Sequence, residues 1–150
     1  MEFNYIATQD KNGFVKNLFK LSFVNDDTPF STIIIPVGFT SFAYLFNDGQ
    51  TSFLGDKEIK LKGLIITGQC YGAYNYFVNK SGLTYGIELH PTALYKIFNT
   101  DISKFTNKHT AFKEINEDLD CSFSKIFLET KNDEKAFANK ITSFLDNINP

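Results

Sequence analysis

The segment from Leu64 to Leu89 constrains the fold most, because it is aromatic, rich in glycine and almost free of charge. Its charged residues are Lys80 and Glu88, in a chain in which 21% of the residues are charged. Strands that are buried on at least one face have this composition. At His90-Pro91 the pattern changes to the residue spacing of an amphipathic helix. We therefore predict a buried pair of strands that is joined directly to a helix.

The two parts of the chain differ in their periodicity. Residues 1–90 contain short alternating runs separated by turn residues, which is typical of antiparallel strands. Residues 91–150 carry apolar residues at helical spacing. With 150 residues, of which 43% are hydrophobic, the chain is long enough for one domain with a substantial core. We predict a single α+β domain: a small antiparallel β-barrel or sandwich of about six to eight strands, followed by about three to four helices.

Local signals predict particular turns, faces and caps. Asn47-Asp48-Gly49 contains residues that tolerate positive φ, and it predicts a hairpin turn after the strand 40–46. Pro91 suits the first position of a helix, and Asp133 is expected to cap the last helix. Alternate residues near the end of the strand-rich part are expected to share a core-facing surface: Leu83, Tyr85, Ile87 and Leu89.

Charge and cysteine usage argue against several classes of function. The net charge is −2, and all 15 basic residues are lysine. Because arginine is the preferred side chain for bidentate recognition of phosphate and guanine, we expect no direct contact with nucleic acid. Cys70 and Cys121 lack CxxC spacing, so we expect reduced thiols. The sequence shows neither a signal peptide nor a membrane-spanning stretch, which predicts a cytoplasmic protein without a membrane partner.

The sequence contains no evident catalytic or metal-binding constellation. Its histidines are His90 and His109, and Glu88 with His90 could supply two metal ligands from one strand face. Because a third and a fourth ligand are not evident, we predict no metal, no cofactor and no enzymatic activity. Neither a serine nor a cysteine lies in a recognisable nucleophile motif.

Polar and aromatic residues of the central strands predict a ligand pocket. The candidate ligand-binding residues are Gln69, Tyr71, Tyr44 and Glu88, since hydroxyls, amides and rings together line many small-molecule sites. Glu88 lies opposite the apolar face of its strand and has space beside it at Gly86, so it could anchor a cation or an amine. In the alternative interpretation the tyrosine rings fill a core or cover a sheet face, and Glu88 is exposed or paired with lysine.

Several short motifs occur in an order that resembles a known family. They are Pro36-Val37-Gly38, Gly68-Gln69, Gly82, Gly86-Ile87, Pro91, Leu94, Phe98 and Ser103-x-Phe105-Thr106-Asn107. Over roughly residues 30–150 this order resembles the N-terminal domain of AraC-type bacterial transcription regulators, with Leu89 where that family usually has phenylalanine. The resemblance implies a regulatory domain that senses a small-molecule effector, forms a homodimer, or does both. It also implies a DNA-binding helix-turn-helix domain, which we expect to be absent from this chain.

Two other functions remain open at this point. A small cupin-like metalloenzyme would need a metal site, and the two histidines of the chain argue against it. A plain dimerisation or scaffold domain would need no ligand, and its strands would enclose a solid core. The last helix could pack its apolar face on the sheet or on a second subunit.

Overall fold

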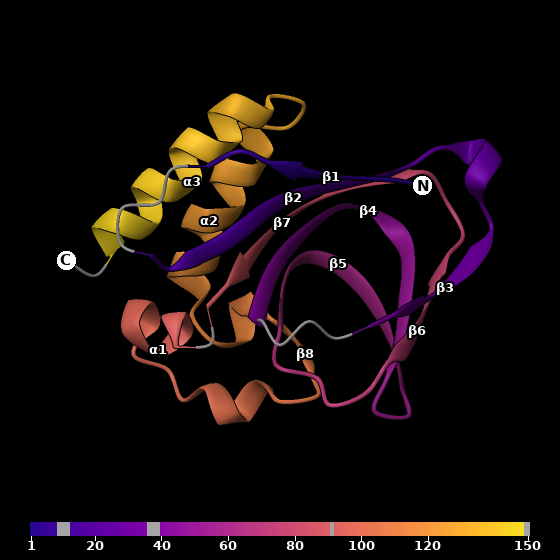
Figure 1. Ribbon diagram of the computed structural model, residues 1–150, viewed down its shortest axis with the longest axis horizontal. Coiled ribbons are helices and arrows are strands. Elements are labelled where there is room, and N and C mark those ends of the chain that lie inside the picture. The colour runs from indigo at the N-terminus through magenta and orange to yellow at the C-terminus, as the bar shows by residue number, and fades with distance from the viewer. Residues whose placement is uncertain (9–12, 36–39, 91, 149–150) are drawn as a thin grey trace.

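The computed structural model describes residues 1–8, 13–35, 40–90 and 92–148, and Figure 1 shows their arrangement. The strands are β1 (Glu2–Ile6), β2 (Val15–Phe23), β3 (Phe30–Ile34), β4 (Thr40–Leu54), β5 (Lys57–Thr67), β6 (Tyr74–Val78), β7 (Gly82–Leu89) and β8 (His109–Ala111). The α-helices are α1 (Ala93–Phe98), α2 (Glu117–Glu129) and α3 (Glu134–Ile148), and 3-10 turns occur at Asn25–Asp27, Ile102–Phe105 and Phe112–Glu114. The predicted α+β class is confirmed, although β8 lies in the part of the chain that was predicted to be helical.

The strands form one antiparallel sheet that is strongly curved and not closed. Its main path runs β1-β2-β7-β4-β5-β8. Two strands lie off this path. The second half of β4 pairs with β6, and β6 pairs in turn with β3. Figure 1 shows α2 and α3 against one end of the rolled sheet, with β3 and β6 at the end away from these helices.

A bulge, and not a turn, bends the long hairpin of β4 and β5. The register of β4 against β5 shifts between Leu45 and Gln50, and Gly49 has a φ of 96° within the continuous strand β4. The predicted hairpin turn at Asn47-Asp48-Gly49 is therefore wrong, because the positive φ of the glycine serves a bulge. The turn that joins the two strands lies at Gly55-Asp56, where both residues have positive φ.

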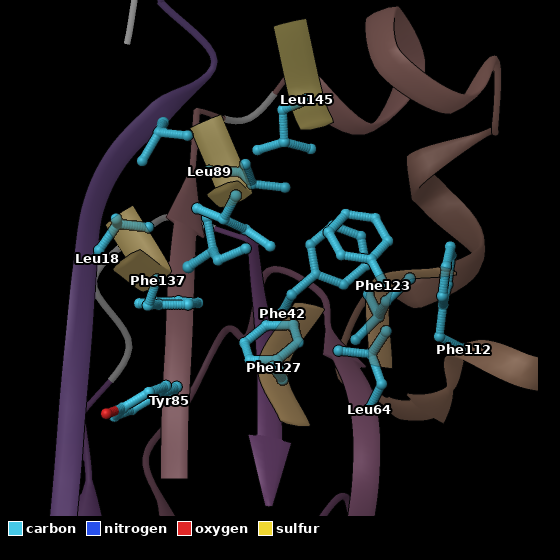
Figure 2. Packing of buried hydrophobic residues seen from close by; sticks show 14 of the residues in the cluster. Leu18, Phe42, Leu64, Tyr85, Leu89, Phe112, Phe123, Phe127, Phe137 and Leu145 are labelled. Carbon is cyan, nitrogen blue, oxygen red and sulfur yellow. The ribbon is translucent and has the colours of Figure 1, made fainter. Parts of the chain in front are cut away.

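One face of the central strands packs on the helices and forms the main core. In this core, Phe42 of β4 lies with its ring centroid 5.4 Å from those of Phe112 and Phe123. Figure 2 shows these rings grouped between the strands and the helices. The predicted core-facing residues of β7 all belong to this cluster and are at most 9% exposed: Leu83, Tyr85, Ile87 and Leu89. We call this surface the helix face of the sheet.

The helix boundaries follow local capping. Asp133 precedes α3 as predicted, and its Oδ1 accepts a hydrogen bond from the Ala136 N–H at 3.0 Å. Pro91, which was predicted to begin the first helix, lies outside the described residues, as does the motif at residues 36–38. No helix in the described part of the chain is both long and apolar enough to cross a membrane.

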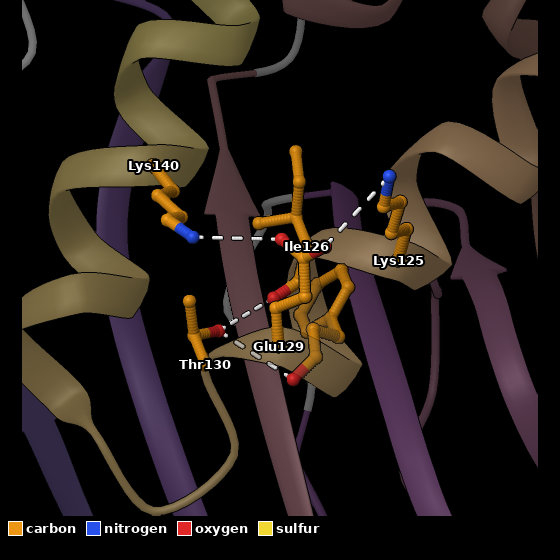
Figure 3. A network of polar contacts seen from close by, with 6 residues as sticks. Lys125, Ile126, Glu129, Thr130 and Lys140 are labelled. Carbon is orange, nitrogen blue, oxygen red and sulfur yellow. Dashed lines mark hydrogen bonds and ion pairs between the residues drawn. The ribbon is translucent and has the colours of Figure 1, made fainter.

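Polar contacts join α2 to α3, as Figure 3 shows. Lys140 of α3 lies 3.4 Å from the Glu129 carboxylate of α2, and Lys125 approaches the same carboxylate at 3.8 Å. The Thr130 hydroxyl donates to the Ile126 carbonyl at 2.7 Å, and this carbonyl also accepts from the Thr130 N–H at 3.1 Å. The charged side chains are largely exposed, so these ion pairs add little to the packing of the apolar helix faces.

Candidate functional site

The opposite face of the central strands lines the inside of the rolled sheet, and we call it the inner face. Side chains of a strand alternate between its two faces, so the residues between the core positions belong to this second surface. Strand register matches the following residues across the main path: Asn17 and Phe19 of β2, Glu88 and Gly86 of β7, Ser41 and Ala43 of β4, Thr67 and Ile65 of β5, and His109 and Ala111 of β8.

Five polar residues form a continuous row across this face. Asn17 pairs with Glu88, Glu88 with Ser41, Ser41 with Thr67, and Thr67 with His109, so the row crosses five strands in register. Directly opposed side chains on one sheet face have Cβ atoms about 4.5–5.5 Å apart. We call these five residues the polar row. All of them are partly exposed, so a small molecule in solution can reach them.

Glu88 carries the charge of the polar row and is oriented by a neighbour. The Asn17 side-chain amide donates to Glu88 Oε2 at 2.8 Å. Among the ion pairs formed by the described residues, none includes Glu88. The lysine partner that the alternative interpretation allowed is therefore not found within these parts of the chain, and the carboxylate keeps hydrogen-bonding capacity for another group.

An apolar row lies next to the polar row along the strands. It consists of Phe19, Gly86, Ala43, Ile65 and Ala111. The Phe19 ring covers Gly86 so closely that a Cβ added to this glycine would lie 1.9 Å from Phe19 Cζ. The ring of Phe3 stacks on Phe19 with a centroid distance of 5.4 Å. The polar row is thus bordered by an aromatic wall.

His109 connects the polar row to the far half of the hairpin. Its Nδ1 lies 2.7 Å from the Thr67 hydroxyl, and its Nε2 lies 2.7 Å from the Ser52 hydroxyl. The Tyr74 ring meets the imidazole edge-to-face at a centroid distance of 5.4 Å. Burial lowers the pKa of His109 to about 4, so the ring is neutral at pH 7, with one nitrogen donating and the other accepting.

The contact between Ser52 and His109 has the distance of a nucleophile and its base. Ser52 is nevertheless fully buried, at 0% exposure, so no substrate can approach its hydroxyl. A histidine with a pKa of about 4 is also a weak base near neutral pH. The geometry therefore indicates a structural role, in which His109 links Ser52 of β4 to Thr67 of β5.

Further polar groups lie deeper on the inner face. The Tyr76 hydroxyl donates to Gln50 Oε1. Gln50 Nε2 and the Thr84 hydroxyl are buried and have no hydrogen-bond partner in the described structure, and the two residues are 1% and 4% exposed. Burial raises the pKa of Tyr74 to about 12 and also raises that of Tyr76, so both phenols stay protonated. An unpaired buried polar atom lowers the free energy of unfolding by about 1–3 kcal/mol.

The structure places the four predicted ligand-binding residues in three different surroundings. Glu88 lies in the polar row. Tyr44 lies on the helix face, with its ring stacked on Phe127 at a centroid distance of 5.1 Å. Gln69 and Tyr71 lie in the exposed loop that follows β5, at the end of the sheet that carries the polar row. Within this set, Glu88 alone belongs to the inner face.

The ligand-binding residues predicted from the sequence do not include the other four members of the polar row. Asn17, Ser41 and Thr67 are common polar residues without a motif, and His109 lies in the part of the chain predicted to be helical. Alternation along each strand could have placed each residue on a face. The register that aligns them joins residues far apart in sequence, such as Asn17 and Glu88, which are separated by 71 positions.

Neither a metal-ligand cluster nor the groove between α2 and α3 offers a stronger candidate site. Within the described residues, no group of three or more His, Cys, Asp and Glu side chains comes together that could hold a metal ion. A surface groove of about 740 Å³ lies between α2 and α3 and is lined by Leu119, Ile126, Glu129, Asn139, Lys140, Ser143, Phe144 and Asn147. Nothing in the structure shows what covers this groove, whereas the inner face combines a charge, hydrogen-bonding groups and an apolar wall.

Comparisons with known proteins add little to this picture. No family model matches the sequence, and no curated protein matches it. Among solved structures, the chain is similar to KdgF from Halomonas sp., with a TM-score of 0.43 and 8% sequence identity over 59% of this chain and 77% of that chain. Similarity at this level supports no conclusion about function. The resemblance to AraC-type regulators is not tested by these comparisons and stays a prediction.

Proposed function

We propose that this protein is a small-molecule-binding domain whose ligand lies against the polar row of the inner face. The observation that carries the proposal is the alignment of Asn17, Glu88, Ser41, Thr67 and His109 across five strands. Ligand sites typically combine a mostly apolar lining with a few convergent polar groups. The aromatic wall supplies the apolar part, and the polar row supplies the convergent groups.

A solid core would not contain the polar row. Buried polar groups are normally hydrogen-bonded and buried charges are paired, because their desolvation is costly. Glu88 accepts one hydrogen bond from Asn17, and Gln50 Nε2 is buried without a partner in the described structure. A bound ligand would supply further partners for the partly exposed Glu88 carboxylate.

At a finer level, we propose that ligand binding regulates a transcription factor of the AraC type. The order of motifs along the chain supports this assignment, and the domain would sense an effector and form a homodimer. We therefore expect the ligand to change the dimerisation constant, which sedimentation velocity would measure. A dimerisation constant that is the same with and without a bound ligand would contradict the regulatory role and leave the binding role intact.

The binding role is tested by a thermal-shift screen of small metabolites. A ligand present at about 100 times its Kd stabilises the folded state by about 2.7 kcal/mol, which corresponds to a rise in Tm of roughly 5–10 °C. The Ser41→Leu variant places a larger apolar side chain in the middle of the polar row, so we expect it to lose this rise. Ser31→Leu, at an exposed position of β3, is the matched control and should keep it.

Two results would overturn the proposal, one from the screen and one from elemental analysis. A broad library that contains cations, anions and neutral compounds should include at least one that stabilises the wild-type protein and fails to stabilise Ser41→Leu. If no compound does so, the inner face is not a ligand site. Elemental analysis of the purified protein provides the second test, since a stoichiometric metal ion would favour the cupin-like enzyme instead.

A further inference from the structure

We infer that the ligand of the polar row is a small organic amine that binds as an ammonium ion to Glu88. This inference rests on the proposed ligand-binding function and adds the chemical class of the ligand. It depends on the charge of the row, on the open hydrogen-bonding capacity of its carboxylate and on the aromatic ring beside it.

The charge of the polar row is negative. Of its five members, Asn17, Ser41 and Thr67 are uncharged at any pH between 4 and 9, and His109 is neutral at pH 7 because burial lowers its pKa to about 4. Glu88 therefore gives the row its single formal charge. The adjoining apolar row contains no ionisable residue. An anionic ligand would be repelled at this surface, and a cation would be attracted.

The Glu88 carboxylate is positioned to accept further hydrogen bonds. The Asn17 side-chain amide donates to Glu88 Oε2 at 2.8 Å. No other hydrogen bond to the Glu88 side chain is found among the described residues. A carboxylate has about four acceptor sites on its two oxygens. An ammonium group has donors that suit both this carboxylate and the hydroxyl of Ser41, which faces Glu88 across the β4–β7 ladder. Charge-assisted hydrogen bonds of this kind are about twice as strong as neutral ones.

The aromatic wall suits the remainder of such a ligand. Phe19 covers Gly86. Gly86 lies two positions before Glu88 and is its neighbour on the same face of β7. Aromatic ring faces attract ammonium groups and also bury the carbon atoms that such a group carries. Phe3 extends this wall, because its ring stacks on Phe19 and is 44% exposed. A carboxylate bordered by rings is therefore complementary to an alkyl or arylalkyl ammonium ion.

A metal cation fits these residues less well. The described part of the chain brings no three His, Cys, Asp or Glu side chains together, and divalent ions require several such ligands. The carbon-rich wall also offers nothing to a hydrated inorganic ion. An organic ammonium ion uses both the carboxylate and the rings.

The test uses pairs of compounds that differ by one group. The probes are phenethylamine with 2-phenylethanol, cyclohexylamine with cyclohexanol, and 1,4-diaminobutane with 1,4-butanediol, titrated into the intact protein by calorimetry and added in thermal-shift assays. We expect at least one amine to bind at least tenfold more tightly than its alcohol. Its affinity should fall as the salt concentration rises, because the interaction is partly ionic.

The variant Glu88→Gln keeps the shape of the side chain and removes its charge. It should weaken binding of the amine by about 10- to 100-fold and leave binding of the alcohol unchanged. Glu58→Gln removes the same charge from an exposed position of β5 and should leave amine binding unchanged. Asn17→Leu provides a second variant, which should weaken amine binding by about 3- to 10-fold through loss of the oriented carboxylate. Circular dichroism confirms that each variant is folded.

The results separate this inference from the proposal on which it rests. The ligand-binding role stands if neutral or anionic compounds bind to the wild-type protein and this binding is lost in Ser41→Leu. The amine assignment is wrong if amines do not bind, or if Glu88→Gln binds them as well as the wild-type protein does. If no compound of any charge distinguishes the wild-type protein from Ser41→Leu, the ligand-binding role itself fails.

Discussion

The helix face and the inner face belong to the same strands but differ in almost every physical property. On β7, Tyr85 and Ile87 face the helices and are 0% exposed. Gly86 and Glu88 alternate with them and face the inside of the roll. The helix face is packed with aromatic rings, whereas the inner face carries a partly exposed polar row beside an apolar row that includes the buried Ile65. The helix face therefore supplies most of the core, and the polar row of the inner face keeps hydrogen-bonding groups within reach of solvent.

The largest expected effect comes from removing a ring on the helix face. Phe123 is 0% exposed, and its ring centroid lies 4.6 Å from that of Phe144 and 5.4 Å from that of Phe42. Phe123→Ala should lower the free energy of unfolding by about 3–5 kcal/mol, because it removes buried area and leaves a cavity. Phe3→Ala on the inner side of β1 is the matched control and should cost less than about 1 kcal/mol. Urea unfolding measures both, and equal losses would contradict the division between the two faces.

The second prediction uses acid to probe the inner face. The pKa of His109 is lowered from 6.5 to about 4 by burial. Between these values the unfolded chain takes up a proton that the folded protein does not, so the free energy of unfolding falls as the pH drops from 6.5 towards 4. Above pH 6.5 the imidazole is neutral in both states, so His109 no longer makes the free energy of unfolding depend on pH. Since one pKa unit corresponds to about 1.4 kcal/mol, the loss attributable to His109 is up to about 3 kcal/mol.

Two variants isolate this contribution. His109→Gln should flatten the dependence of unfolding free energy on pH in this window, measured by urea titrations at half-unit intervals. Asn75→Gln, at an exposed position of β6, leaves the imidazole in place and should keep the wild-type slope. If His109→Gln keeps that slope as well, the imidazole is not held neutral between Ser52 and Thr67.

The parts of the structure that sequence predicted correctly depend on short-range physics. Alternation placed Leu83 and Tyr85 in the core, and the preference of aspartate for helix caps placed Asp133 before α3. The candidate Glu88 was found in the same way, because alternation put it opposite the core residues. Each of these features is determined by residues that are neighbours along one element.

The missed parts depend on pairings between distant strands. Nothing local reveals that Ser52 meets His109 across 57 positions, or that residues 109–111 add a strand to the edge of β5. The three residues at 47–49 carry a strong hairpin signal, but β4 continues through them because both of its halves find partner strands. The prediction that Tyr44 lines a pocket is wrong for a related reason. Alternation puts Tyr44 on the same face of β4 as Phe42, but it does not reveal that this face meets the helices.

The smallest predicted effect tests the contact that forms the aromatic wall. Gly86→Ala places a methyl group where the Phe19 ring lies, and overpacking of this kind costs about 1–3 kcal/mol. Because the tip of a side chain can move more easily than backbone, we expect the lower half of this range. Gly72→Ala is the matched control, because a Cβ there meets nothing within 4 Å. This substitution should leave the free energy of unfolding unchanged within about 0.5 kcal/mol.

The double variant Phe19→Ala with Gly86→Ala decides whether the wall exists as described. Without the ring, the new methyl group has no obstacle, so the loss in the double variant should be smaller than the sum of the two single losses by about 1 kcal/mol. Additive losses would mean that the ring does not rest on Gly86 in solution. The polar row would then border open space, and the inner face would resemble a solvated sheet surface more than a ligand site.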